Sequence, residues 1–280
     1  MNVVTTIADM RTLAESHRKK GRTIGFVPTM GFLHEGHLSL MREARKSCDI
    51  VVVSIFVNPT QFGPGEDFDR YPRDEKGDRE KCEAEGIDVL FIPSAAEMYP
   101  PGDSVSVPVE GIADILEGAS RPGHFRGVAT VVARLFTIVG PHKAFFGQKD
   151  FQQTVVIERM ATGLNMDVKI VVLPTVREQD GLAMSSRNSY LRADERRAAA
   201  SLYRALSEGE GLIRSGVGAA SKLKRAMRAV LEKEAGIEID YLEIVDPESL
   251  VSLREIEHRA VLLVAARIGR TRLIDNVLIL

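Results

Sequence analysis

The sequence predicts an α/β protein in which a doubly wound, Rossmann-like parallel sheet is followed by a smaller α+β domain. Strand and helix patterns alternate through the first 175 residues, which is typical of successive βαβ units. After Pro174 the pattern changes, and two helices precede three strands. We therefore expect one domain at residues 1–175 and a second at residues 176–280.

The first βαβ unit is expected to comprise a strand at 23–27, a helix at 36–47 and a strand at 50–57. The first strand is expected to end at Pro28, which has no N–H to donate to a ladder. The helix has apolar residues at helical spacing. The second strand is apolar on both faces and stops at Asn58. Two strands joined through a helix in this way should be parallel.

The later elements continue this alternation and then depart from it. In the first domain we expect helices at 73–85, 127–139 and 151–162, strands at 88–92, 143–146 and 167–172, and an extended segment at 105–109. In the second domain we expect helices at 194–213 and 219–234, and strands at 237–245, 259–266 and 271–280. Doubly wound sheets bind ligands beyond the carboxyl ends of their strands, so polar residues at those ends are candidate site residues.

Composition narrows the class of protein. Of 280 residues, 44% are hydrophobic and 27% are charged, which suits a folded domain rather than a disordered chain. The formal net charge of -2 argues against a partner such as nucleic acid, which needs a basic face. The apolar stretches are too short to span a bilayer, and we expect no signal peptide. Cys48 and Cys82 match no metal spacing and are expected to be buried, reduced thiols.

The turn His34-Glu35-Gly36-His37 follows the first strand and opens a helix. Unpaired N–H groups at a helix start attract phosphate, and Gly31 and Gly36 allow the backbone to approach a ligand. The imidazoles could donate hydrogen bonds where charge builds up as pyrophosphate leaves. A zinc pair is the first alternative, although no third ligand is evident. A pair of ordinary surface histidines is the second. We favour the phosphate site.

Two further segments lie where strands are expected to end. Asn58 and Gln61 offer amide groups suited to hydroxyls or a carboxylate, although Asn58-Pro59 could be a simple turn. The second segment, 147–153, begins with a glycine and runs into a helix. In it Lys149 can place a point charge on phosphate, whereas Asp150 could only cap the helix.

The segment 184–188 reads Met-Ser-Ser-Arg-Asn, in which two hydroxyls and a guanidinium suit a triphosphate. A polar loop is the alternative. The segment 122–127, Pro-Gly-His-Phe-Arg-Gly, is a glycine-flanked loop before a helix and could add a phosphate contact.

Together these segments resemble the pantoate–β-alanine ligase family, of the His-x-Gly-His nucleotidyltransferase superfamily, over essentially the whole chain. The matching motifs are PTMGFLHEGH at 28–37, FVNPTQF at 56–62, GQKDFQQ at 147–153 and SSRN at 185–188. Four motifs in the same order and at matching intervals are far more specific than any one of them. One position departs, because many members have Glu where this chain has Gln148.

The resemblance implies a two-step ligase reaction. Pantoate attacks the α-phosphorus of ATP and pyrophosphate leaves. β-Alanine then attacks the bound pantoyl adenylate, which gives pantothenate and AMP. Mg²⁺ is implied with ATP, without a protein metal site, as are a homodimer and a cytoplasmic location. The second domain is expected to close over the ATP site.

The resemblance also implies roles for individual residues. Gln61, Gln153 and Asn58 would bind substrate. The two glutamines would bind pantoate, and Gln61 would also lie near β-alanine. His37 would be the proton donor. The other catalytic candidates are His34, Lys149, Ser185, Ser186 and Arg187. The ATP-binding candidates are Met30, Gly31, Phe32, Leu33, His34, Glu35, Gly36, His37, Gly147, Gln148, Lys149, Asp150, Val176, Met184, Ser185, Ser186 and Arg187.

Three rival functions stay open on the sequence. An adenylyltransferase acting on a nucleotide or on a pantetheine phosphate would share the histidine turn. A truncated class I aminoacyl-tRNA synthetase would share a serine-rich second loop. Neither rival needs amides such as those of Gln61 and Gln153, which suit a small polar acid. An ATP-binding sensor without catalytic activity would need the nucleotide site alone.

Overall fold

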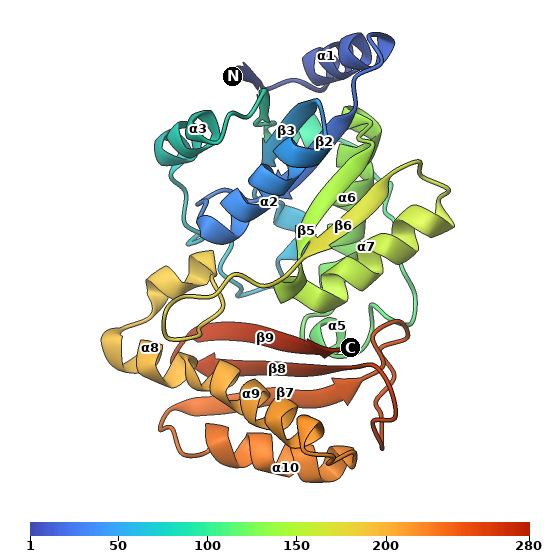
Figure 1. Cartoon of the computed structure of the whole chain (residues 1–280). Coiled ribbons are helices and arrows are strands. Elements are labelled where there is room, and N and C mark those ends of the chain that lie inside the picture. The colour runs from blue at the N-terminus through green and yellow to red at the C-terminus, as the bar shows by residue number, and fades with distance from the viewer. The chain divides into compact units, whose positions relative to one another are not determined.

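The computed structural model describes all 280 residues, Met1–Leu280, and divides into two compact units (Figure 1). Unit 1 comprises Met1–Gly147 and Gln153–Pro174. Unit 2 comprises Gln148–Gln152 and Thr175–Leu280. The short segment Gln148–Gln152 thus belongs to unit 2, although the strand before it and helix α7 from Gln153 onward belong to unit 1.

Unit 1 has a six-stranded sheet with helices in the connections. Its strands are β1 (Asn2–Val4), β2 (Ile24–Thr29), β3 (Ile50–Ile55), β4 (Val89–Phe91), β5 (Lys143–Gly147) and β6 (Lys169–Leu173). Its helices are α1 (Ile7–Lys19), α2 (Glu35–Ser47), the 3-10 turn η1 (Pro59–Gln61), α3 (Glu75–Ala84), α4 (Ala95–Met98), α5 (Glu117–Ser120), α6 (His124–Val139) and α7 (Phe151–Gly163).

The sheet order is β1-β4-β3-β2-β5-β6, and every pair of neighbouring strands is parallel. Apolar side chains from α1, α6 and α7 form one buried cluster with the sheet, and those from α2 and α3 form another with β2, β3, β4 and β5. The helices therefore cover both faces, which confirms the predicted doubly wound fold. The strand order reverses at β2, whose neighbours β3 and β5 lead in opposite directions, and ligands bind at such a point.

Several predicted boundaries in unit 1 were wrong, and β2 is the most informative. It continues through Pro28 to Thr29. The N–H of Ile50 donates to Thr23 O and that of Phe56 to Thr29 O, so the odd-numbered residues of β2 face β3. Pro28 therefore faces β5, where pairing already ends at Phe26. Its missing N–H costs no ladder bond, which is why the strand tolerates it.

Other differences concern elements that were missed or displaced. No element was predicted before residue 23, yet β1 and α1 lie there. The segment 105–109 joins neither sheet, and Val107 N–H instead donates to Thr130 Oγ1 on α6. Helix α6 begins at His124 rather than Gly127, so four of the six residues of the predicted polar loop 122–127 are helical. β3 ends at Ile55, two residues early.

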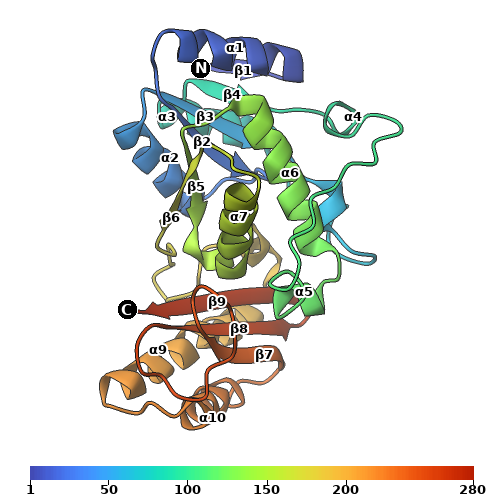
Figure 2. The same ribbon diagram turned by 90° about the vertical axis from the view of Figure 1, so that its right-hand side faces the viewer.

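Unit 2 is an antiparallel three-stranded sheet covered by helices. Its elements are the 3-10 turns η2 (Gln148–Asp150) and η3 (Ser186–Tyr190), the helices α8 (Ala193–Ala199), α9 (Ser201–Arg214) and α10 (Ala220–Leu231), and the strands β7 (Ile237–Val245), β8 (Ala260–Ile268) and β9 (Thr271–Ile279). The strand order is β7-β8-β9. Helices α9 and α10 pack side by side on one face of this sheet (Figure 2).

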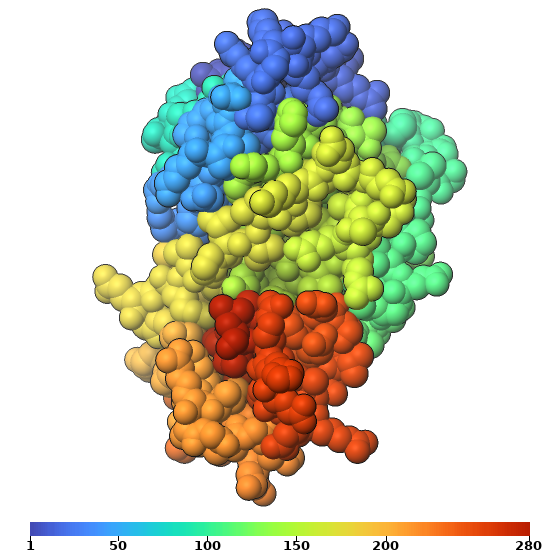
Figure 3. All heavy atoms as spheres, turned by 45° about the vertical axis from the view of Figure 1, so that its right-hand side comes forward, coloured from blue at the N-terminus to red at the C-terminus, as the bar shows by residue number.

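The smaller α+β unit is therefore confirmed, with one correction. The single helix predicted at 194–213 is two helices, α8 and α9, which meet at Ala200. Ala200 has helical φ and a ψ of -17°, so the chain bends there without leaving the helical region. A run of alanines carries no sequence signal for such a bend. In the space-filling view the orange and red residues of α9, α10 and β7–β9 form one close-packed body (Figure 3).

Candidate active site

The start of α2 is capped by its own histidines. His34 is the N-cap residue, and its Nδ1 accepts the N–H of Gly36 at 3.2 Å. His37 Nδ1 in turn accepts the N–H of His34 at 3.2 Å, and the N–H of His37 donates to His34 O. Sequence reasoning had assigned the N–H groups of this helix start to phosphate. The structure corrects that expectation, because the helix satisfies several of them itself.

These hydrogen bonds fix which ring nitrogen carries the proton. A neutral imidazole has one donor nitrogen and one acceptor nitrogen. Nδ1 accepts in both His34 and His37, so the proton of each neutral ring is on Nε2. The ring centroids lie 4.1 Å apart, which allows both rings to serve one anionic group. The turn therefore carries two side-chain N–H groups close together.

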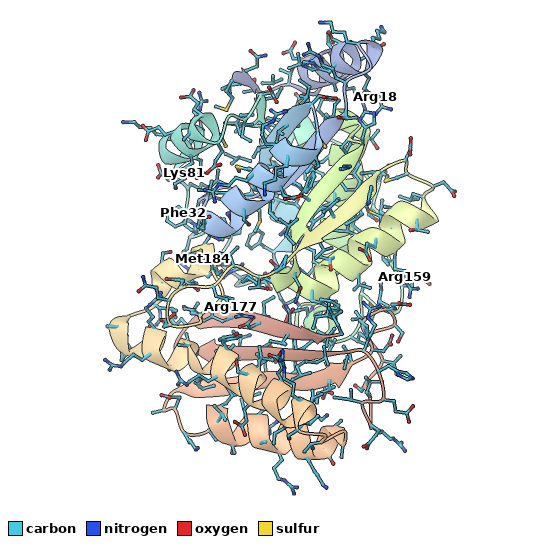
Figure 4. All side chains as sticks on the ribbon, in the orientation of Figure 1. Arg18, Phe32, Lys81, Arg159, Arg177 and Met184 are labelled. Carbon is cyan, nitrogen blue, oxygen red and sulfur yellow. The ribbon has the colours of Figure 1, made fainter.

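A carboxylate from α3 holds the turn that precedes these histidines. Asp78 Oδ2 accepts the N–H of Phe32 and Oδ1 accepts that of Leu33, both at 2.7 Å. Lys81, one turn further along α3, donates to Leu33 O at 2.8 Å. Figure 4 shows Phe32 and Lys81 near each other, where this turn meets α3. Burial raises the pKa of Asp78, and the two N–H groups and the charge of Lys81 oppose that rise.

The backbone of this turn is in an unusual conformation. Gly31 has a φ of +80° and Phe32 a φ of +51°, a value that bulky residues rarely adopt. A Cβ on Gly31 would lie 2.9 Å from Ile55 Cγ2 and 3.0 Å from Asp78 Oδ2, so no larger residue fits. Successive N–H groups with positive φ form a concave anion site. Here the anion is the protein's own Asp78.

Two of the three predicted substrate amides, Asn58 and Gln61, lie together beyond β3. Asn58 is 1% exposed, and its Nδ2 donates to Gln61 Oε1 at 3.0 Å and to Gly127 O at 3.2 Å. Its Oδ1 accepts from Tyr99 Oη at 2.7 Å and from Thr60. The protein therefore already occupies the hydrogen-bonding groups of Asn58. Gln61 keeps a weakly held donor, because its Nε2 points at Met30 Sδ, 3.3 Å away.

The main chain of Gln61 is held from a second direction. His124 Nδ1 lies 2.8 Å from Gln61 O, and Arg121 Nη1 lies 3.1 Å from His124 Nε2. Arginine only donates, so His124 accepts at Nε2 and donates from Nδ1 to Gln61 O. Arg121 also forms a two-point ion pair with Glu66, at 2.8 and 2.6 Å. Burial, followed by the charge of Arg121, lowers the pKa of His124 to about 4. The segment 122–127, which was expected to contact phosphate, thus supports the main chain of Gln61 through His124.

In unit 2, β9 holds the turn that contains Lys149. Asn276 is 1% exposed, and its Nδ2 donates to Gln148 O and to Lys149 O, both at 2.9 Å. Gln148 Nε2 donates to Asn276 Oδ1 at 3.1 Å, so the amide at position 148 pairs with the amide of Asn276. Lys149 Nζ lies 3.5 Å from Asp150 Oδ1, and the Asp150 side chain is 46% exposed.

A buried ion pair supports the segment that leads to the Ser-Ser-Arg motif. Arg177 donates to both oxygens of Asp275, at 2.6 and 3.0 Å, and lies over the ring of Tyr203. Burial raises the pKa of Asp275, and Arg177 opposes that rise. Because Asp275 and Asn276 are adjacent on β9, this strand anchors both the lysine turn and the approach to the motif. Figure 4 labels Arg177 and Met184 in this segment.

The Ser-Ser-Arg motif itself begins beside Val176. Met184 N–H donates to Val176 O at 3.0 Å, and Arg177 pairs with Ala183. The two candidates Val176 and Met184 are therefore adjacent. Ser185 then caps η3, because its Oγ accepts the N–H of Arg187 at 3.3 Å.

The structure groups the predicted residues by unit. In unit 1 it brings together Met30, Gly31, Phe32, Leu33, His34, Gly36 and His37. Gln61, with Asn58 beside it, joins this group through Met30. Glu35 instead pairs with Arg42 on α2, and Gln153 lies in the first turn of α7. In unit 2, the turn Gln148–Asp150 is bound to Asn276 of β9. Val176 and Met184 lie beside Ser185, Ser186 and Arg187.

Sequence reasoning missed the residues that hold these segments. They are Asp78 and Lys81 for the histidine turn, Tyr99 and Arg121 for the amides, and Arg177, Asp275 and Asn276 in unit 2. No local motif marks them, since each acts on residues distant in the chain. His124 lies in the segment 122–127 that the sequence singled out, but it supports Gln61.

The structure contains no group of three or more His, Cys, Asp or Glu side chains that could hold a metal ion. None of its helices is both long and apolar enough to span a membrane.

Known proteins match this chain along its whole length. The model of a family described as pantoate-beta-alanine ligase matches residues 2–278. A protein named pantothenate synthetase from Acetivibrio thermocellus is 52% identical over 279 residues, covering 100% of this chain and 99% of the relative. One of the same name from Thermotoga neapolitana is 53% identical over 279 residues, covering 100% of both.

Solved structures agree with the sequence matches. A crystal structure of pantothenate synthetase from Thermus thermophilus superposes with a TM-score of 0.94 at 48% identity, covering 99% of each chain. A pantoate-beta-alanine ligase from Francisella tularensis, complexed with beta-gamma ATP and beta-alanine, superposes with a TM-score of 0.81 at 35% identity. That match covers 99% of this chain and 97% of the other.

Proposed function

The chain belongs to the pantoate–β-alanine ligase family, and on that premise we propose which of its residues perform each part of the reaction. The enzyme condenses pantoate with β-alanine in an ATP-dependent reaction through pantoyl adenylate, and it releases AMP and pyrophosphate. The family match over residues 2–278 decides against the nucleotide adenylyltransferase, synthetase and sensor alternatives.

The two steps set different demands on the site. In the first, a pantoate carboxylate oxygen bonds to the α-phosphorus of ATP, and the bond to the bridging oxygen breaks as pyrophosphate leaves with the electron pair. In the second, the β-alanine amine bonds to the activated carbonyl carbon, AMP leaves, and the nitrogen loses a proton. In the first step negative charge grows on the departing pyrophosphate, and in the second it grows on the leaving AMP. A fixed N–H donor accelerates the step whose leaving group it contacts.

We assign the histidine turn to the phosphates. His34 and His37 would donate from Nε2 to ATP, and His37 would donate to the departing pyrophosphate. The observation that carries this assignment is the pair of bonds from backbone N–H to Nδ1, since they place the proton of each neutral ring on Nε2. The rest of the segment from Met30 to Gly36 would shape the ATP site through its backbone.

We assign the amides to pantoate. Gln61 Nε2 would exchange its weak thioether contact with Met30 for a pantoate oxygen, and Gln153 would bind the same acid. Asn58 would act through Gln61 rather than touch the substrate, because its own hydrogen bonds are already made within the protein. This modifies the substrate-binding role that the sequence suggested for Asn58.

We assign the candidate residues of unit 2 to ATP, together with Gly147 at the end of β5 in unit 1. Lys149 would place its charge on the phosphates, with Gly147, Gln148 and Asp150 forming the turn around it. Ser185, Ser186 and Arg187 would add hydroxyl donors and a forked cation, which suits a triphosphate. Val176 and Met184 would meet the nucleotide beside them. The predicted closing of the domain at 176–280 over the ATP site stays a proposal.

We propose Mg²⁺ as the ion that accompanies ATP. Magnesium usually keeps several waters and binds through substrate phosphates and one or two carboxylates. The residues present fit such an ion, since Asp150 is a half-exposed carboxylate beside Lys149 and would be its protein ligand. When bound, Mg²⁺ would neutralise part of the triphosphate charge. We also propose a homodimer and a cytoplasmic location, as the family resemblance implies.

Turnover with three substrates tests the assignment. Incubation with Mg-ATP, pantoate and β-alanine should release AMP and pyrophosphate in equal amounts. His37→Ala should slow pyrophosphate release by roughly a hundred- to a thousand-fold, the usual loss for one such donor. Gln61→Ala should weaken pantoate use more than ATP binding. Near-normal pyrophosphate release by His37→Ala would show that His37 has no role in the mechanism. If Gln61→Ala weakened pantoate use and ATP binding equally, Gln61 would not be part of the pantoate pocket.

A further inference from the structure

The backbone before His34 needs support that its own sequence does not supply. A non-glycine residue with positive φ costs on the order of 1–3 kcal/mol and persists only where its surroundings enforce it. Phe32, with a φ of +51°, is such a residue, and it lies two positions before His34. The turn would relax toward a common conformation if nothing opposed it, and the relaxation would redirect the helix start.

Asp78 opposes that relaxation. It is 1% exposed, and each of its two carboxylate oxygens accepts one N–H from consecutive residues of the turn, Phe32 and Leu33. Lys81 binds the carbonyl of Leu33 from the same helix. The turn is thus held by an N–H on each of two residues and by one carbonyl. The next residue is His34, whose ring and backbone set the position of His37.

We propose that Asp78 is a positioning residue for adenylation. Its carboxylate fixes the backbone of Phe32 and Leu33, and this aims the Nε2–H groups of His34 and His37. The inference rests on the proposed role of the two histidines. It goes beyond that role by placing the determinant of their geometry on α3, outside every motif of the site.

Asp78→Asn is a sharp test because it changes almost no volume. Asparagine has one side-chain acceptor, so one of the two N–H groups would face an NH₂ donor. A misplacement of about 1 Å at a reacting group costs on the order of a hundred-fold. We expect Asp78→Asn to slow the first half-reaction, measured as pyrophosphate release in a single turnover, by about ten- to a hundred-fold.

The second half-reaction distinguishes a positioning role from a general structural defect. A structural defect would slow both half-reactions, whereas a positioning role should slow only the first. When the variant receives preformed pantoyl adenylate and β-alanine, it should form pantothenate at a rate within about two-fold of normal. Glu80→Gln is the matched control, since it makes the same chemical change on an exposed side of α3. It should leave both half-reactions unchanged.

Phe32→Gly provides a rescue. Glycine adopts positive φ without strain, so adding Phe32→Gly to Asp78→Asn should recover part of the lost pyrophosphate release. If Asp78→Asn does not fold, Lys81→Met replaces it and should slow the first half-reaction by a few-fold.

Several outcomes would overturn the proposal. They are equal slowing of both half-reactions, no slowing of either by the folded variant, no rescue by glycine, and no effect of Lys81→Met where that variant is used. An unaffected His37→Ala would instead refute the proposed function of the histidines, so the two failures are distinguishable.

Discussion

Gly127→Ala tests how closely α6 approaches the turn that carries Gln61. In an exposed helix interior this change normally stabilises by about 1 kcal/mol. At Gly127, however, the new Cβ would lie 2.3 Å from Thr60 O, 2.6 Å from Thr60 C and 2.7 Å from Gln61 N. All three are backbone atoms, so no side chain can turn away. Asn58 also ties the carbonyl of Gly127 to Gln61.

The size of the effect follows from these distances. Ordinary Cβ contacts begin at 3.4 Å, so η1 and α6 must separate by about 1 Å to relieve the contact with Thr60 O. Overpacking of this kind costs ~1–3 kcal/mol, which exceeds the gain in helix propensity. The same displacement moves Gln61, and a shift of about 1 Å in a positioning group costs on the order of a hundred-fold in rate.

Gly211→Ala is the matched control, because Gly211 lies in α9 and a Cβ there would meet no atom within 4 Å. Urea unfolding should show Gly211→Ala more stable than the parent by ~0.5–1 kcal/mol and Gly127→Ala less stable. Only Gly127→Ala should lose turnover at limiting pantoate. The reasoning is refuted if both variants gain stability, or if Gly127→Ala keeps normal pantoate use.

Three further predictions follow from buried groups. His124 has a pKa of about 4 when folded and 6.5 when unfolded, so protonation favours the unfolded chain, and stability present above pH 6.5 is lost as the pH falls toward 4. Between about pH 7 and about pH 5 the urea-unfolding free energy of the parent should therefore fall by roughly 2 kcal/mol more than that of His124→Gln; parallel profiles would contradict this. Arg177→Met leaves the carboxylate of Asp275 buried and unpaired and should cost ~3–5 kcal/mol, whereas Arg177→Met with Asp275→Leu should recover most of that loss. If the double variant were as unstable as Arg177→Met alone, the loss of stability would not come from the unpaired carboxylate of Asp275. Burial raises the pKa of the Cys82 thiol to about 12, and Cys48 is also buried, so a disulfide reagent should modify the native enzyme far more slowly than the unfolded chain; equal rates would count against this burial.

The order of strands and helices was predictable because burial leaves a periodic pattern in the sequence. The strands at the centre of the sheet are continuous apolar runs, and the helix after β2 repeats its apolar residues at helical spacing. The elements β1 and α1, which were not predicted, carry weaker signals. Thr6 caps α1 by accepting the N–H of Asp9, a Thr-x-x-Asp pattern that could have indicated this helix. A three-residue edge strand such as β1 has no periodicity to detect.

The candidate site was predictable only where its residues form motifs at strand ends. Asp78 lies in a helix of mostly charged residues, and from sequence alone it is indistinguishable from the exposed Glu80. Its role depends on residues 45 and 46 positions away. The self-capping of α2 was also hidden, because it depends on which nitrogen of each imidazole faces the backbone. Such details follow from three-dimensional geometry, which residue spacing does not encode.

The bonds from Asn276 to the lysine turn also set the order in which this enzyme can be completed on the ribosome. Asn276 lies 127 positions after Lys149, so the turn leaves the exit tunnel long before its anchor exists. Unit 1 already has all six strands of its sheet by Leu173, well before β9 is made. A nascent chain stalled before β9 should therefore contain a folded parallel sheet beside an unformed lysine turn. Protease digestion of such stalled chains would cut near Lys149 and spare β2 and β3.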